Sequence, residues 1–188
     1  MSLRPDANSS AGTLEGKILF AAPALDGSVF KRSVILVAKH SKEDGAFGLV
    51  LNQPSDQVVG DLIPSDEFAP LAKIPVHIGG PVSPGHLSFT ALWLNDEGKL
   101  QYAAQTSAKN AIRRDRQPGT LVRAFVGYTG WSAGQLEDEL KKDSWVLADV
   151  PESLLGTAHD ESMWAANLRQ MGPFHRVLAE FPERPELN

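Results

Sequence analysis

The chain has 188 residues and contains no cysteine. That absence excludes disulfide bonds, thiolate catalysis, iron–sulfur clusters and zinc sites built on cysteine. Long apolar runs are missing too, since none approaches the ~20 residues that a membrane-spanning helix needs. Ile18–Leu25 has the composition of a signal segment, but Pro23 interrupts it and a polar stretch with charges of both signs precedes it. We interpret it as a buried strand and expect a cytoplasmic protein without a membrane partner.

An excess of positive charge is also lacking, because 23 Asp and Glu residues outnumber 18 Lys and Arg residues. The resulting net charge of -5 argues against broad nucleic-acid binding. A local basic cluster nevertheless consists of Lys109, Arg113, Arg114, Arg116 and Arg123. It has no interleaved aromatic residue, so a solvated face is the favoured interpretation. We expect an unknown protein as the partner, and nucleic acid stays an alternative that the charge does not support.

The histidines show no metal-binding spacing. Neither H-E-x-x-H nor H-x-x-E-H occurs, and His159 beside Asp160 and Glu161 is typical of a solvated loop. His40 ends a predicted strand before a polar turn. The sequence therefore predicts no metal ion and no cofactor.

Length and composition predict one globular domain. Residues 1–13 and 182–188 are polar and lack a hydrophobic period, so we expect a disordered N-terminal tail and a C-terminal tail around a domain of residues 14–181. Short segments rich in Val, Ile, Leu and Phe predict the strands of this domain. They are Lys17–Ala22, Ser33–Ala38, Ala46–Leu51, Pro75–Ile78, Leu87–Leu94, Leu121–Val126 and Trp145–Val150.

Helical patterns gather in the second half of the chain. Ser107–Arg114 is the first, and Asp160 precedes a second that ends before Gly172-Pro173. A third pattern spaces its apolar residues as on one helix face, which we expect to lie on the core. Its members are Phe174, Val177, Leu178 and Phe181. Strands first and helices later predict a single α+β domain with a mostly antiparallel, barrel-like sheet of short strands flanked by helices.

Residues Phe125–Leu140, FVGYTGWSAGQLEDEL, combine the end of a strand, a glycine-rich turn and the start of a helix. Ser132 and Gln135 have the spacing of a capping box, in which each side chain satisfies a backbone N–H of the first helical turn. Trp131 and Leu136 have the spacing of a hydrophobic staple. Local folding therefore explains most of the segment without any function.

Three functional hypotheses compete with that explanation. Gly130–Gly134 matches G-x-S-x-G, the nucleophile elbow of serine hydrolases, and Asp160 and His175 follow Ser132 in the order of acid and base. The short chain and the missing βαβ alternation argue against this hydrolase. Alternatively, N–H groups of the Gly127–Gly134 turn at the helix start hold a phosphate or carboxylate.

A partner surface is the third hypothesis, with Tyr128 and Trp131 as exposed aromatic anchors. A filled core around Trp131 and Ser132 would favour this interaction role. A concave pocket there, lined by His40, Asn52 or His77, would favour small-molecule binding instead.

Taken together, the segments resemble the bacterial YqgE/AlgH family. The matching pieces occur in family order and cover roughly residues 14–170, which makes the match more specific than any short motif. They are Leu14–Leu19 with Ala22-Pro23, Phe30–Val34, His40, Gly45–Pro54, Gly79–Val82, Gly127–Trp131 and Gly134–Glu137. The family motif leaves the position of Ser132 open, which weakens the hydrolase hypothesis further.

The resemblance implies an α+β fold with a barrel-like sheet surrounded by helices, a cytoplasmic location and no established catalytic activity. Some members carry the label of transcriptional regulator. We therefore expect a non-enzymatic regulatory or interaction protein, and alternatively a small-molecule, nucleotide or anion-binding protein. The residues expected to bind are His40, Asn52, Gly79, Gly80, Gly127, Tyr128, Gly130, Trp131, Gln135 and Glu137.

Overall fold

The computed structural model describes residues 13–156 and 158–180. Its centre is a nine-stranded sheet with the order β4-β5-β8-β3-β2-β1-β9, in which β6 pairs with both β8 and β7. The strands are β1 (Ile18–Ala21), β2 (Val34–Ser41), β3 (Gly45–Val50), β4 (Pro54–Val58), β5 (Pro75–Ile78), β6 (Val82–Leu94), β7 (Leu100–Thr106), β8 (Thr120–Trp131) and β9 (Trp145–Ala148). The α-helices are α1 (Val59–Leu62), α2 (Ala108–Asp115), α3 (Gln135–Lys141), α4 (Ser162–Gln170) and α5 (Pro173–Ala179). Three 3-10 helices are η1 (Pro23–Leu25), η2 (Asp66–Leu71) and η3 (Glu152–Leu155).

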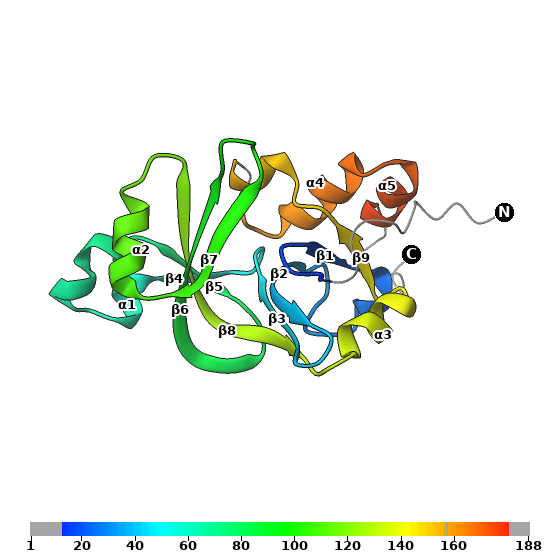
Figure 1. Ribbon diagram of the computed structural model, residues 1–188, viewed down its shortest axis with the longest axis horizontal. Coiled ribbons are helices and arrows are strands. Elements are labelled where there is room, and N and C mark those ends of the chain that lie inside the picture. Colours follow the sequence, from blue (N-terminus) through cyan, green and yellow to red (C-terminus); the bar gives the residue numbers. More distant parts are fainter. Residues whose placement is uncertain (1–12, 157, 181–188) are drawn as a thin grey trace.

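The sheet curls into a half-barrel with helices at both ends of the molecule (Figure 1). α1 and α2 lie at one end, and α3, α4 and α5 lie at the other. Strand pairs in the sheet are antiparallel except for β5 and β8, which run parallel with Val76 opposite Ala124. The predicted α+β class and the barrel-like, mostly antiparallel sheet are confirmed.

Apolar side chains pack on both faces of the sheet. In β2 every residue of the run 34–38 is buried. Val34 and Leu36 belong to the cluster that contains α4 and α5 side chains, whereas Ile35 and Val37 belong to the cluster beneath α3. A strand covered on both faces has a continuous apolar sequence rather than an alternating one, as this run does.

The predicted strands are all present, and β5 has the predicted bounds Pro75–Ile78. Two of them are longer than the short strands that we expected, since β6 has 13 residues and β8 has 12. The sequence does not predict β4 or β7, because PSDQV is largely polar and LQYAAQT lacks a run of Val, Ile, Leu or Phe. Pairing with β5 and β6 therefore determines their conformation, since strand preference depends strongly on neighbouring strands.

Two predicted helices begin with polar contacts near the expected positions. α2 follows Ser107, whose hydroxyl accepts from the Asn110 N–H at 3.3 Å. α4 begins at Ser162, and Asp160 Oδ1 accepts from the Ser162 N–H at 2.9 Å. α2 therefore starts at its predicted cap, whereas α4 starts one residue later than a cap at Asp160 predicts, because Glu161 is its N-cap.

The predicted core face of α5 is wrong in part. Phe174 and Val177 are 70% and 68% exposed. Of the predicted face, Leu178 packs on the apolar cluster, and Ala179, which is not part of that face, is buried in the same cluster. The reason is that α5 packs mainly against α4, which turns a different side of this short helix inward. Phe181 lies outside the described residues.

Half of the predicted capping box at α3 is present. The Ser132 N–H donates to Gln135 Oε1 at 3.0 Å. The prediction of the reciprocal hydrogen bond is wrong. The Gln135 N–H donates to the Ser132 carbonyl at 3.0 Å rather than to the Ser132 hydroxyl. Gly134, at φ +74°, makes a tight turn that places this carbonyl next to the helix start. Trp131 and Leu136 share one apolar cluster, as the staple predicts.

The two predicted tails fall almost entirely outside the described residues. Thr13 is described, and its hydroxyl donates to the His40 carbonyl at 3.2 Å. Across residues 13–156 and 158–180, no helix combines the length and the apolar composition that crossing a membrane requires.

Candidate functional site

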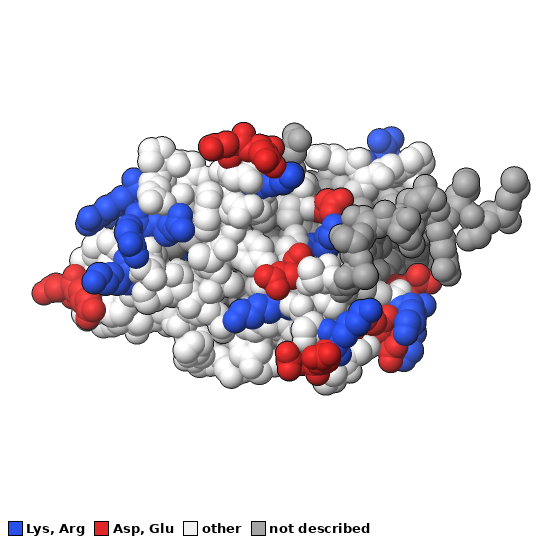
Figure 2. Space-filling view, in the orientation of Figure 1, with Lys and Arg blue, Asp and Glu red and all other residues white. Residues whose placement is uncertain are grey.

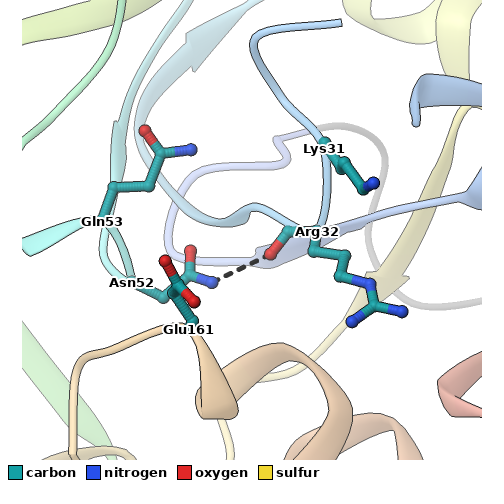
Figure 3. A pocket seen from close by; sticks show the side chains of 5 residues that line it. All are labelled: Lys31, Arg32, Asn52, Gln53 and Glu161. Atoms are coloured by element: carbon teal, nitrogen blue, oxygen red, sulfur yellow. Dashed lines mark hydrogen bonds between the residues drawn. The ribbon is translucent and has the colours of Figure 1, made fainter. Parts of the chain in front are cut away.

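A pocket of about 350 Å³ opens at the rim of the sheet where three separate segments meet. Lys31 and Arg32 precede β2, Asn52 and Gln53 connect β3 to β4, and Glu161 directly precedes α4. Figure 3 shows these side chains around the opening. The described lining thus contains two cations, one carboxylate and two amides.

Asn52 fixes the shape of this pocket. Its side chain is 2% exposed, and its Oδ1 accepts from the Val34 N–H at 2.8 Å. Its Nδ2 donates to the Arg32 carbonyl at 2.9 Å, the bond drawn in Figure 3. Arg32 has a φ of +51°, which few residues other than glycine adopt. The two hydrogen bonds of the Asn52 side chain therefore help to hold a strained turn that presents Lys31 and Arg32.

The same turn is connected to the helical layer. The Arg32 guanidinium carbon lies 5.2 Å from the centre of the Trp164 ring in α4. The indole N–H of Trp164 donates to the Ala21 carbonyl at 2.9 Å, which fixes that ring against β1. Gln53 Nε2 donates to the Ser33 hydroxyl at 3.2 Å on the opposite side of the turn. Arg32 is thus positioned by side chains from two layers of the fold.

Two buried histidines lie next to the pocket segments. His77 pairs with Pro54, the residue after Gln53, and His159 lies two residues before Glu161. His77 Nε2 lies 3.0 Å from the His159 carbonyl, and His159 Nε2 lies 2.9 Å from the Leu154 carbonyl. Because a carbonyl only accepts, each Nε2 carries the proton and donates. The bond from His77 thereby ties β5 to the segment that leads to Glu161.

Burial favours the neutral form of these two histidines. Burial lowers the pKa of both imidazoles below the ordinary value of 6.5, and the nearby Arg123 guanidinium lowers it further. Their Nδ1 atoms are buried and have no hydrogen-bond partner. In the part of the chain that the structure describes, no group of three or more His, Asp or Glu side chains has the arrangement of a metal site. The neutral pair therefore connects β5 to the segment that leads to Glu161 at the pocket.

His40, a predicted binding residue, connects three segments elsewhere. Its Nδ1 accepts from the Leu14 N–H at 3.0 Å, so its Nε2 carries the proton and donates to Glu137 Oε1 at 2.9 Å. The pKa of the Glu137 carboxyl is lowered, first by its own backbone N–H and then by His40. These contacts hold α3 and the segment before β1 against β2.

Trp131 and Gln135 belong to a second contact of α3. Glu139 Oε2 accepts from the indole N–H groups of Trp131 at 2.9 Å and Trp145 at 2.8 Å. Gln135 Nε2 donates to Glu139 Oε1 at 2.9 Å. The two indole rings meet edge to face with centres 6.1 Å apart. Trp131 is 6% exposed and therefore contributes to a filled core rather than to an exposed anchor.

The predicted glycines lie where two backbones cross. A Cβ on Gly79 would lie 2.4 Å from the Gly127 carbonyl oxygen, and one on Gly80 would lie 2.3 Å from the Tyr128 carbonyl carbon. Gly127 also has a φ of +70°. Gly130 is exposed in β8 opposite Phe47. Close backbone packing accounts for Gly79, Gly80 and Gly127.

The structure does not bring the three hydrolase candidates together. The Ser132 hydroxyl contacts Gln135 Oε1 at 3.1 Å, and Asp160 Oδ1 accepts from the Ser162 hydroxyl at 2.6 Å. His175 lies on α5. Among the described residues no hydrogen bond joins any two of Ser132, Asp160 and His175.

Asn52 is therefore the predicted binding residue that lines the pocket. Sequence reasoning misses Lys31, Arg32, Gln53 and Glu161. A signal exists for the first three, because they lie in two of the segments on which the family resemblance rests. Glu161 gives no such signal, since its position depends on how α4 packs.

Comparison with known proteins supports this fold. A family model described as AlgH-like matches residues 18–175. The chain belongs to the AlgH-like family. A UPF0301 protein from Parabacteroides distasonis is 33% identical over 93% of this chain and 91% of its own length. Another from Chlorobium limicola is 33% identical over 92% of this chain and 95% of its own length.

Two solved structures share the AlgH-like fold. The AlgH protein from Pseudomonas aeruginosa has a TM-score of 0.66 and 22% identity, with 94% of this chain and 98% of that chain covered. Protein DIP2367 from Corynebacterium diphtheriae has a TM-score of 0.67 and 24% identity, with 93% and 96% covered. The names of these relatives state no activity, so the family is a bacterial one of uncharacterised function.

Proposed function

We propose that this AlgH-like protein is a cytoplasmic, non-enzymatic regulatory protein that binds a small anionic metabolite in the pocket around Lys31 and Arg32. The observation that carries the proposal is that Lys31 and Arg32 both line a pocket whose turn is fixed by buried Asn52. A turn held in this way needs little ordering when the ligand binds, and that favours affinity.

The charge and size of the pocket indicate the ligand class. A guanidinium and an ammonium are the side chains that recognise phosphate and carboxylate groups best. Glu161 supplies an acceptor for a hydroxyl or amino group on the same ligand. A volume of about 350 Å³ suits a small metabolite. A phosphorylated sugar, a nucleotide or a hydroxy acid has these features.

A binding role is favoured over catalysis by the chemistry of the lining. Its described residues contain no Ser, Thr, Cys or His, and Glu161 is the one carboxylate among them. The regulatory part of the proposal rests on the family resemblance, and it requires a protein partner that responds to the ligand.

The ligand is tested with a thermal-shift screen of nucleotides, sugar phosphates and hydroxy acids, followed by calorimetry. A ligand at about 100 times its Kd stabilises the fold by about 2.7 kcal/mol, which raises Tm by roughly 5–10 °C in a domain of this size. Lys31→Ala should abolish most of that shift. Lys39→Ala is the matched control, because Lys39 is an exposed lysine near the far end of β2.

The result that contradicts the proposal is an absence of stabilisation by every compound, or an equal loss in the Lys31→Ala and Lys39→Ala variants. The regulatory part is tested separately by pull-down from native lysate with and without the identified ligand. Recovery of a partner that is unaffected by the ligand would leave binding intact and reject regulation.

A further inference from the structure

Two adjoining hollows flank Arg114 at the end of the molecule that carries α2. One has a volume of about 290 Å³ and is lined by Thr106, Asn110 and Arg113. The other has a volume of about 590 Å³ and extends past Trp93. Both are also lined by Arg114 and Gln117, so the two hollows adjoin at these side chains. We call them together the Arg114 groove, made by Trp93, Thr106, Asn110, Arg113, Arg114 and Gln117.

The groove is locally basic in an acidic protein. The chain as a whole has a net charge of -5, yet α2 and the residue after it carry Lys109, Arg113, Arg114 and Arg116 against the single acid Asp115. Figure 2 shows cationic side chains gathered over this end of the molecule. None of the described residues that line either hollow is acidic. The groove therefore attracts negative charge locally, although the protein as a whole is acidic.

A cation and an aromatic ring are stacked inside the groove. The Arg114 guanidinium carbon lies 4.1 Å from the centre of the Trp93 ring. Arg114 Nη1 also donates to Gln117 Oε1 at 3.1 Å, which holds the guanidinium in place. The other three tryptophans, Trp131, Trp145 and Trp164, are at most 6% exposed, whereas Trp93 is only partly buried. The preference of arginine for a helix C-terminus explains the charge on α2 but does not explain this stack.

The two amides of the groove present donors. A guanidinium only donates, so the amide atoms that meet it are oxygens. Asn110 Oδ1 accepts from Arg113, and Gln117 Oε1 accepts from Arg114. Each amide is therefore oriented with its NH₂ group turned away from its arginine. The groove thus combines fixed cations, a flat stacked surface and amide donors for acceptor groups.

We propose that the Arg114 groove binds single-stranded nucleic acid. Phosphates contact Arg113 and Lys109, and a base stacks on the outer face of the Arg114 guanidinium, whose other face lies over the Trp93 ring. Grooves for single strands combine positive charge along the backbone with planar side chains for the bases. The bases of a duplex are already stacked on one another, so a duplex cannot use this surface. The site is separate from the pocket around Lys31.

Fluorescence anisotropy with a labelled oligouridylate of about 12 nucleotides tests the proposal. The variant Arg113→Gln/Arg114→Gln should weaken binding by at least about tenfold at physiological salt, and it should flatten the salt dependence because fewer counterions are released. Lys141→Gln/Lys142→Gln is the matched control. It removes the same charge from α3 at the other end of the molecule, where both lysines are exposed.

Trp93 provides a second measurement that a general charge effect would not change. Oligouridylate should quench part of the tryptophan fluorescence of the wild-type protein. Trp93→Phe should remove that part and keep the fold, since a ring still occupies the site. Lys31→Ala should bind the oligonucleotide like wild type, which separates this site from the proposed metabolite pocket.

Four outcomes would overturn the proposal. They are a wild-type Kd above about 0.1 mM at physiological salt, equal losses in the groove and control variants, equal affinity for a duplex of the same length, and equal affinity for polyglutamate. The last result would assign the groove to an acidic protein partner instead.

Discussion

Single buried side chains determine the shape of the proposed pocket. Asn52 satisfies the N–H of Val34, the first residue of β2, and the carbonyl of Arg32 on the turn before that strand. A buried polar group that loses its partner costs about 1–3 kcal/mol, so the amide matters for stability as well as for binding. Its type follows from this geometry, because an amide both donates and accepts.

Asn52→Ala should therefore lower the free energy of unfolding by roughly 2–4 kcal/mol, because it leaves the Val34 N–H and the Arg32 carbonyl without their partner. Urea denaturation measures the change. Asn95→Ala is the control, since the Asn95 side chain likewise makes two bonds to the backbone, accepting from the N–H groups of Glu97 and Lys99, but in an exposed turn. Equal losses in the two variants would mean that the buried position of Asn52 is not what makes it important.

At the scale of elements, α3 depends on its contacts with the sheet. It has seven residues, and isolated helices shorter than about 12–15 residues are marginal in water. Leu136 fills the core beneath it, while Glu137 and Glu139 bind His40, Trp131 and Trp145. Side chains from one face of this short helix therefore hold it by both apolar and charged contacts.

Glu139→Ala should destabilise the protein by roughly 2–3 kcal/mol, because two indole N–H groups lose a charged acceptor. The near-ultraviolet circular dichroism should change as well, since the edge-to-face contact of Trp131 and Trp145 loosens. Asp138→Ala on the same helix is the control, as Asp138 pairs with exposed Lys141 and should have no measurable effect. If Glu139→Ala had the same free energy of unfolding as the wild type, the apolar contacts alone would hold α3 on the sheet.

The elements also show how far sequence reasoning reaches. Pro75–Ile78 is predicted at its observed bounds because a local apolar run and flanking turns coincide there. β4 and β7 cannot be predicted from their own sequences, because pairing with β5 and β6 is what makes them strands. The pocket is only partly predictable for the same reason. Asn52 is recognisable within its own segment, whereas Glu161 reaches the site through the packing of α4.

For the whole molecule, the neutral pair His77 and His159 connects the sheet to the segment before α4. Both imidazoles are nearly completely buried, at 3% and 5% exposed, next to Arg123. Protonation of either ring would place a second positive charge beside this guanidinium in a poorly solvated site. Acid should therefore lower the free energy of unfolding of the whole protein through these two residues.

The sign of this effect follows from the two states. The folded pKa of each histidine lies below the unfolded value of about 6.5, so the unfolded chain binds more protons in the window below that value. Stability is therefore fully present above about pH 7.5 and falls as the pH decreases through 6.5. The slope cannot exceed about 2.7 kcal/mol per pH unit for two histidines. The lowered pKa of Glu137 acts in the same direction at lower pH.

Urea denaturation of wild type and of His77→Gln/His159→Gln between about pH 5 and 8 tests this prediction. Glutamine keeps an N–H donor for each carbonyl but does not titrate there, so the variant should show a flatter profile and relatively greater stability at acidic pH. His86→Gln is the control, because His86 is exposed in β6 and should leave the profile of the wild type unchanged. A wild-type profile that is flat through pH 6 would show that the two buried imidazoles do not couple protonation to unfolding.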